Sequence, residues 1–280
     1  MAFLASWNAY VPRASTSGIP VRASHRSSQV LCLRSPASRI IPKAIAANKI
    51  APALSEQLLG ARKIAMDLFA AIESKGILAP GRTETDIDKQ VFDLAAADFG
   101  TRKHWHQRLP RVGQNTTHPI YDKVADMALQ EDDIVYVDLG PVFGDMEADF
   151  GRTYVLGDDA EKHKLNAALE QVFSKCKQYY LSDPGMTGAD FFEYVRKASS
   201  ECGYEYANPK YCAHLLGKFS HDVEFGGDPQ HFACPECRTP MNAPGPDGQE
   251  RMWVLEIHLL QDPGIGKYGG FYEDLLNLPT

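Results

Sequence analysis

No run of about 18 apolar residues occurs in this 280-residue chain, which argues against a helix that spans a membrane. Acidic residues are absent from residues 1–55, which contain seven Lys and Arg and are rich in Ser and Ala. That composition is typical of an organelle transit peptide and cannot form a hydrophobic core. We therefore expect residues 1–50 to be a disordered transit peptide, addressed to the chloroplast or, alternatively, the mitochondrion. A basic tail without a targeting function is the competing interpretation.

A cationic body is also missing. The chain carries a net charge of −7 and residues 1–55 carry +7, so the remainder carries −14, which argues against nucleic-acid binding. The six cysteines lack the spacing of a disulfide framework, which fits a reducing compartment. Cys234 and Cys237 form one Cys-x-x-Cys pair in a Pro- and Gly-rich connection. A plain loop is the favoured interpretation of this pair, and a zinc site completed by His231 or Cys212 is the alternative.

One phrase, Pro-Gly-x-Thr-x-x-Asp, occurs twice, at residues 80–86 and 184–190. Each copy precedes an amphipathic segment, and its Thr is a good helix N-cap with an acid three residues on. Chance similarity of two helix starts would explain this, but the copies stand at corresponding points of two halves of similar size. We interpret the repeat as an internal duplication into two αβ halves.

The remaining elements follow from hydrophobic periodicity. A helix is expected over residues 52–76, and the two repeat phrases open helices that end near Phe99 and Gly203. The halves would place their strands side by side in one curved sheet with helices outside, an α+β domain over residues 51–280. The expected strands cover residues 134–137, 147–156, 252–260 and 270–276.

The expected strands predict that two aspartates lie close together. Asp138 ends an apolar run, and Asp149 lies 11 residues later, on a segment that returns after a Phe-Gly-Asp turn. A hairpin would therefore bring two carboxylates together inside a core. Buried like charges need compensation or they become protonated, and a metal ion supplies it. Two unrelated surface aspartates near a turn are the alternative.

Further candidates lie in the second half. Glu256 is flanked by Leu and Ile in the middle of a strand, where an unpaired carboxylate is costly. Glu273 repeats the pattern, although an acid on an edge strand would explain it as well. His214 and His221 are seven residues apart, as a metal ligand and a substrate-facing side chain could be, or as two structural histidines could be.

The order Asp, Asp, His, Glu, Glu resembles the five-ligand signature of the pita-bread metallopeptidases, the methionine aminopeptidase, Xaa-Pro aminopeptidase and creatinase family. The first strands end in a similar Asp-x-x-Arg-Thr phrase at 149–153. The segment 214–221 resembles the His-Gly-x-Gly-x-x-x-His phrase of that family, and residues 273–274 resemble its closing Glu-Asp. The likeness covers about residues 52–280 and implies a single-domain pita-bread fold, with two pseudo-symmetric αβ halves around a curved antiparallel sheet.

The resemblance also implies roles for these residues. Asp138 would chelate one of two divalent metal ions, Asp149 and Glu273 would bridge both, and His214 and Glu256 would complete the ligands of the other. Four carboxylates and one imidazole suit Mn, Fe or Co better than Zn. The ions would activate a water for attack on an amide. His118 and His221 resemble the two substrate-facing histidines of the family, although an exposed loop position would also explain His118.

The expected function is thus an aminopeptidase-like hydrolase that acts on a small peptide, including Xaa-Pro peptides, with a homodimer as the expected assembly. Ala213 and Leu215 replace the glycines that usually flank the first His, and Ile257 replaces a Pro. We expect these departures to lie around the substrate pocket. They leave open a small amide-like substrate, as for creatine hydrolases, or another non-peptide small molecule, as for a dimethylsulfoniopropionate lyase. A third alternative is a catalytically inactive protein-binding module.

Overall fold

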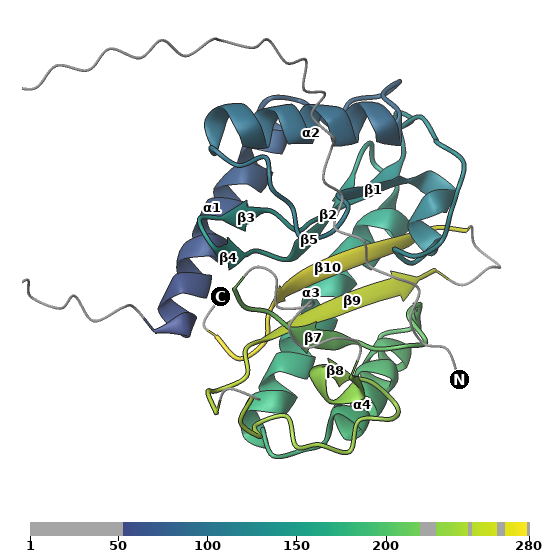
Figure 1. Cartoon of the computed structure of the whole chain (residues 1–280). Helices are drawn as coiled ribbons and strands as arrows, with labels where there is room; N and C mark the ends of the chain where they lie inside the picture. Colours follow the sequence, from purple (N-terminus) through teal and green to yellow (C-terminus); the bar gives the residue numbers. More distant parts are fainter. Residues whose placement is uncertain (1–52, 219–227, 246–247, 262–266, 279–280) are drawn as a thin grey trace, which may run out of the picture.

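The computed structural model describes residues 53–218, 228–245, 248–261 and 267–278. One antiparallel sheet runs through both halves of the chain, with strands in the order β1-β2-β5-β10-β9-β7-β8 and with β6 paired to β9 (Figure 1). Its strands are β1 (Leu109–Val112), β2 (Ile134–Leu139), β5 (Phe150–Val155), β6 (Glu205–Tyr206), β7 (Ala213–Leu215), β8 (Phe232–Ala233), β9 (Trp253–Leu260) and β10 (Gly269–Leu275).

A two-stranded sheet and two short 3-10 helices complete the β regions. The small sheet is the hairpin of β3 (Val142–Phe143) and β4 (Met146–Glu147), joined through Gly144 in a positive-φ conformation (66°). This is the turn predicted between Asp138 and Asp149. The 3-10 helices are η1 (Gly113–Thr117) and η2 (Pro229–His231).

Within the described residues, four α-helices pack against the large sheet. They are α1 (Leu54–Ser74), α2 (Glu84–Asp98), α3 (Ala160–Ser182) and α4 (Gly188–Glu201). In Figure 1, α3 lies behind β9 and β10, and α4 lies at the edge formed by β7 and β8. The predicted helices and strands are present within a few residues of their expected limits, except that the strand expected over residues 147–156 is interrupted between β4 and β5. The helix α3 and the strands β1, β6, β7 and β8 were not predicted. No helix of the described residues is long and apolar enough to cross a membrane.

The repeated phrase forms the same structure twice. The Asp86 N–H donates to Thr83 Oγ1 (3.2 Å), and the Thr83 N–H donates back to the Asp86 carboxylate (3.2 Å). Thr187 and Asp190 form an equivalent capping box with distances of 3.2 and 3.4 Å. Each box satisfies two backbone donors at the start of α2 or α4. The two halves therefore begin their second helices with identical chemistry, as the duplication predicts.

Alternation along the central strands separates core from site. Leu255 and Ile257 of β9 are fully buried among residues of α3 and α4, whereas Val135 and Val137 of β2 pack with residues of α1. Successive side chains of a strand point to opposite faces. The residues between them, such as Glu256, therefore point to the face that the helices leave uncovered. This is how apolar strands come to present carboxylates at one place.

The seam between the halves, β5 against β10, has a single register pair, Glu273 opposite Gly151. Side chains supplement it. Thr153 Oγ1 donates to the carbonyl of Phe271 (2.8 Å) and accepts from its N–H (2.7 Å). Arg152 donates to the carbonyl of Glu273 (2.6 Å) from the helix side. Arg152 and Thr153 thus fix the backbone of β10 on both sides of the Glu273 side chain.

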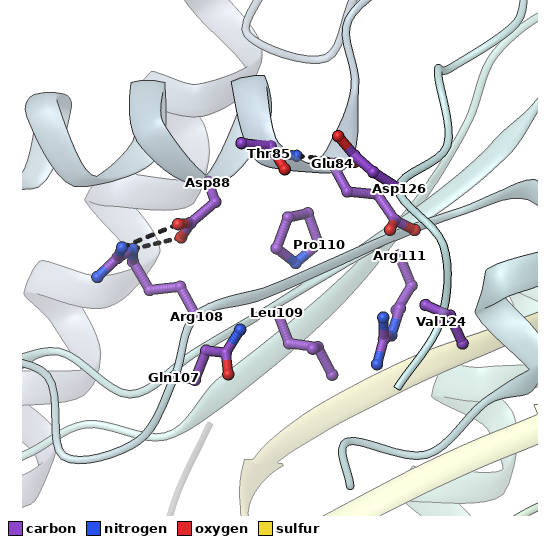
Figure 2. Close-up of a pocket in the computed structure, with 10 residues that line it drawn as sticks. All are labelled: Glu84, Thr85, Asp88, Gln107, Arg108, Leu109, Pro110, Arg111, Val124 and Asp126. Carbon is purple, nitrogen blue, oxygen red and sulfur yellow. Dashed lines mark hydrogen bonds and ion pairs between the residues drawn. The ribbon is translucent and has the colours of Figure 1, made fainter. Parts of the chain in front are cut away.

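A pocket of about 180 Å³ lies between the start of α2 and β1 (Figure 2). Its charged groups are engaged within the fold. Arg108 forms a two-point ion pair with Asp88 (2.6 and 3.0 Å), and Glu84 accepts from Val112 N–H (2.8 Å) and Asn115 Nδ2 (3.0 Å). These contacts tie α2 to β1. We assign this pocket a structural role, because the chemically distinctive groups of the chain gather elsewhere.

Candidate metal centre

The structure brings the five predicted ligands together on the uncovered face of the sheet. Asp138 comes from β2, Asp149 from the residue before β5, His214 from β7, Glu256 from β9 and Glu273 from β10. Each is at most 8% exposed. Five segments separated by up to 135 residues in sequence therefore contribute to one buried polar cluster in the middle of the sheet.

His214 lies at the centre of one part of this cluster, which contains Glu256 and Glu273 from the second half of the chain. Its Nε2 lies 3.1 Å from Asp149 Oδ2, 3.4 Å from Glu256 Oε1 and 3.8 Å from Glu273 Oε1. Its Nδ1 lies 2.8 Å from the carbonyl oxygen of Leu215, so this nitrogen carries the proton and donates it. Glu256 and Glu273 are direct cross-strand partners, which places their side chains next to each other. No Lys or Arg of the described residues forms an ion pair with either glutamate.

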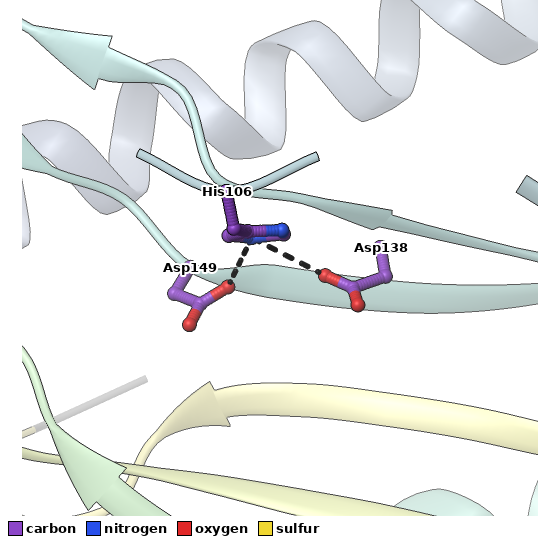
Figure 3. Close-up of side chains that lie close together, drawn as sticks. All are labelled: His106, Asp138 and Asp149. Carbon is purple, nitrogen blue, oxygen red and sulfur yellow. Dashed lines mark hydrogen bonds and ion pairs between the residues drawn. The ribbon is translucent and has the colours of Figure 1, made fainter. Parts of the chain in front are cut away.

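A histidine that was not predicted stands on the other side. Figure 3 shows His106 above Asp138 and Asp149, with its ring directed at both carboxylates. His106 Nε2 lies 3.1 Å from Asp149 Oδ1 and 3.6 Å from Asp138 Oδ1. The side chain of His106 is 2% exposed. The signal in the sequence was the phrase His104-Trp105-His106 before β1, but nothing local to it shows that β1 runs beside the strand of Asp138.

The buried carboxylates and imidazoles of the cluster shift one another's pKa values strongly. Burial raises the pKa of Glu256 to about 8 and of Asp138 to about 7, and burial with the neighbouring carboxylates raises the pKa of Glu273 well above its usual range. Burial opposes protonation of His214 and His106, but the carboxylates outweigh it and raise both imidazole pKa values to about 9. The direction of these shifts shows that the cluster favours bound positive charge.

The donor set fits divalent metal ions. Two triads have ligand atoms within 4.8 Å of one another, His106 with Asp138 and Asp149, and Asp149 with His214 and Glu273, so Asp149 belongs to both. Donors about 2.1 Å from one ion lie roughly 3.0–3.4 Å apart at octahedral to tetrahedral angles, close to the spacings here. Asp138 Oδ1 and Glu273 Oε2 are buried without a hydrogen-bond partner. Four carboxylates also match the charge of two divalent ions.

Of the two predicted substrate-facing histidines, His118 lies within the described residues and His221 does not. His118 follows η1, its side chain is 45% exposed, and its Nδ1 lies 3.0 Å from Asp122 Oδ2. It belongs to neither metal-binding triad, although Tyr136, on the strand and face of Asp138, donates to its carbonyl oxygen (3.0 Å). His221 lies outside the described residues, as do residues 1–50.

The residues that depart from the family pattern lie in the hydrophobic core and not around the substrate pocket. Ala213, Leu215 and Ile257 all belong to the hydrophobic core between the sheet and α3 and α4. The expectation that they line the substrate pocket is therefore wrong, because they alternate with His214 and Glu256 and point to the other face. Cys234 and Cys237 are buried free thiols in a loop whose Cys237 carbonyl accepts from the Ala189 N–H at the start of α4 (2.9 Å). They are outside both metal-binding triads of the described residues.

The sequence profile of the metallopeptidase family M24 matches residues 56–252. The chain belongs to metallopeptidase family M24. The match covers most of the chain and includes Asp138, Asp149 and His214. A search of curated protein sequences gives no match.

Solved structures with the same fold include an X-Pro aminopeptidase, a prolidase and a methionine aminopeptidase. The X-Pro aminopeptidase from Thermotoga maritima has a TM-score of 0.62 and 16% identity, over 80% of this chain and 61% of that one. The prolidase from Pyrococcus furiosus has a TM-score of 0.56 and 17% identity, over 79% of this chain and 59% of that one. The methionine aminopeptidase from Thermotoga maritima has a TM-score of 0.55 and 18% identity, over 82% and 98%.

These likenesses confirm the pita-bread fold, with its two αβ halves around an antiparallel sheet. The M24 chain spans about 60% of the length of the X-Pro aminopeptidase and the prolidase, and nearly the whole of the methionine aminopeptidase.

Proposed function

We propose that this chain is a dinuclear-metal hydrolase that cleaves an amide bond in a small peptide, with Xaa-Pro peptides as the first candidates. The observation that carries the proposal is the pair of buried triads that share Asp149. Membership of family M24 and the fold of an X-Pro aminopeptidase and a prolidase support it. The oxygen-rich donors favour Mn, Fe or Co over Zn.

The positions of the side chains support the ligand roles that the family resemblance implies. Asp138 belongs only to the triad with His106 and would hold one ion, and His214 and Glu256 would hold the other. Asp149 directs one oxygen to each side of the cluster, which is the arrangement of a bridging carboxylate. Glu273 would bridge as well, since it lies opposite Glu256 with one oxygen near His214 and the other without a hydrogen-bond partner.

Bound ions would lower the pKa of a shared water and so provide hydroxide near neutral pH. The chain supplies the rest. Its carboxylates keep the site neutral overall, and the core beneath the sheet holds them without a competing Lys or Arg among the described residues. We propose that His118 and His221 contact the carbonyl oxygen or the leaving nitrogen of the substrate. Their variants should lower turnover without loss of metal.

The experiment begins with elemental analysis of protein purified without chelators, where about two Mn, Fe or Co per chain are expected. Activity is then measured on Xaa-Pro dipeptides, longer Xaa-Pro peptides and Met-initiated peptides. Glu256→Gln keeps the shape of the side chain and removes its charge, so hydrolysis is expected to fall by roughly three orders of magnitude with only a small change in melting temperature. Full metal content with a lowered melting temperature in this variant would show that Glu256 is a structural acid.

The same panel tests the alternative substrates. Creatine-like amidines and dimethylsulfoniopropionate are included, because the fold does not define the substrate. Turnover of one of these without peptide hydrolysis would support a non-peptide substrate on the same metal site. Bound metal without turnover of any compound would favour the protein-binding alternative.

We also propose that residues 1–50 direct import into the chloroplast, with the mitochondrion as the alternative. The support is their basic, acid-free composition. Fused to a fluorescent protein, this segment is expected to deliver it to the organelle. A matched fusion in which Arg13, Arg22 and Arg26 are replaced with Glu should remain in the cytosol. Cytosolic fluorescence from both fusions would contradict the proposal.

A further inference from the structure

His106 and His214 are presented to the cluster in the same way. The Nδ1–H of each donates to the carbonyl of the next residue, Gln107 or Leu215, at 2.8 Å. The Nε2 of each lies 3.1 Å from Asp149, His106 on Oδ1 and His214 on Oδ2. A histidine that binds a metal through one nitrogen almost always donates a hydrogen bond from the other, which fixes the tautomer. Both imidazoles have this arrangement.

The loop that bears His106 is built to hold the ring in this position. Trp105 N–H donates to the carbonyl of Gly140 (2.8 Å), and Trp105 Nε1 donates to that of Ala148 (3.1 Å), so the loop is attached on both sides of the hairpin between Asp138 and Asp149. The Trp105 ring packs edge-on against His106, with centroids 4.6 Å apart. A histidine that only filled space would not need these attachments.

Gly140 provides the room for the ring. A Cβ at this position would lie 2.1 Å from His106 Cδ2 and 2.3 Å from its Nε2. Real Cβ contacts do not become this short, so a side chain at position 140 would force the buried His106 ring to shift. Gly140 follows Asp138 by two residues, directly after the end of β2, and leaves the gap through which the imidazole reaches that carboxylate.

We propose that His106 is a sixth protein ligand, which binds the ion held by Asp138 so that each of the two ions has one imidazole. The proposal rests on the proposed dinuclear site and adds a nitrogen donor to the ion that Asp138 would hold. With Nδ1 protonated, a neutral His106 turns a lone pair toward two carboxylate oxygens, and one of these, Asp138 Oδ1, lacks a hydrogen-bond partner. A cation between the three atoms satisfies all of them.

The competing role is an ion pair, in which a protonated His106 only neutralises Asp138 and Asp149. The two roles differ in their response to metal. A ligand loses its proton and is required for metal affinity. An ion-paired cation competes with metal for the same carboxylates, so its removal would leave metal binding unchanged or tighten it. The sign of the change in affinity therefore distinguishes them.

The test uses His106→Gln, with His104→Gln as the matched control. His104 lies two residues away in the same loop, is mostly buried near Phe92 and belongs to neither triad. The metal-free proteins are titrated with Co²⁺, and the stoichiometry, the two dissociation constants and the visible absorption of bound Co²⁺ are measured. We expect His106→Gln to weaken one of the two sites by roughly 100-fold or more, at or beyond the upper end of the losses seen for outer-shell partners. Its Co²⁺ spectrum should change, and the control should match the parent protein.

Gly140→Ala is a second variant that keeps all six donors. It should displace the His106 ring and reproduce the loss of one site, and Gly60→Ala, on α1 with no atom within 4 Å of a new Cβ, is its control. Two Co²⁺ sites with parental affinity and spectrum in folded His106→Gln would overturn the inference and leave the proposed function intact. Absence of metal binding by the parent protein would instead overturn the proposed function.

Discussion

Glu273→Gln is expected to remove bound metal and leave the fold intact, whereas Asp274→Asn, one residue further on, is expected to weaken the fold and leave the metal bound. The two acids alternate across β10. Glu273 faces the cluster, where burial and the other carboxylates raise its pKa well above the usual range. Asp274 faces the helices, where Arg62 contacts it at 2.7 and 2.9 Å and Arg152 at 2.6 Å.

The metal-free protein should tolerate Glu273→Gln, because burial and the neighbouring carboxylates raise the pKa of Glu273 and so favour its uncharged form, whose shape the amide reproduces. Glu273→Gln removes the negative charge of one bridging carboxylate. At least one ion should therefore be lost, and hydrolysis should fall by roughly three orders of magnitude. The melting temperature measured in chelator should equal or exceed that of the parent. The melting temperature measured with metal should lose most of the increase that metal gives the parent.

Asp274→Asn leaves two guanidinium groups at one site without a carboxylate. Breaking a buried ion pair by removal of one partner costs about 3–5 kcal/mol, which in a chain of this size lowers the melting temperature by about 10 °C. Metal content per folded chain should stay near two. Loss of metal in Asp274→Asn without loss of stability, or the reverse pattern in Glu273→Gln, would show that the faces of β10 are assigned wrongly.

The pair also illustrates what the sequence could and could not predict. The helices α2 and α4 were predictable because their starts are local, with Thr and Asp three residues apart. Asp138, Asp149, His214, Glu256 and Glu273 could be predicted as a set through resemblance to a family, since spacing and order carry the signal.

What could not be predicted depends on registers between distant strands. His106 reaches Asp138 and Asp149 because its loop is hydrogen-bonded to residues 140 and 148, a pairing with no trace in the local pattern. The departures at Leu215 and Ile257 were assigned to the pocket by their closeness in sequence to ligands, but alternation along a strand puts neighbours on opposite faces. The helix α3 is a different case: its buried residues Leu165, Leu169, Val172 and Cys176 recur at helical spacing, so its signal was present.

A steep pH dependence of the metal-free protein is the second large effect. Burial raises the pKa of Glu256 to about 8 and that of Asp138 to about 7, and the carboxylates raise those of His106 and His214 to about 9 against the effect of burial. All four groups bind protons more tightly in the folded chain than in the unfolded one. Each therefore contributes stability that is present below its unfolded pKa and is lost as the pH rises through its folded pKa. The lowered pKa of Asp149, about 2, acts only at more acidic pH.

In chelator, the free energy of unfolding should thus fall by several kcal/mol between about pH 5 and pH 9, since one pKa unit corresponds to about 1.4 kcal/mol. Divalent ions replace those protons, so metal affinity should rise over the same range and metal should release protons when it binds. Calorimetric melting temperatures from pH 5 to 9, with chelator and with Mn²⁺, should diverge as the pH rises. Glu256→Gln should flatten the chelator curve, because it removes one of the titrating groups. A metal-free protein that becomes more stable from pH 5 to pH 9 would mean that the carboxylates are already ionised and compensated by other groups, and the case for two ions between His106 and His214 would lose its electrostatic basis.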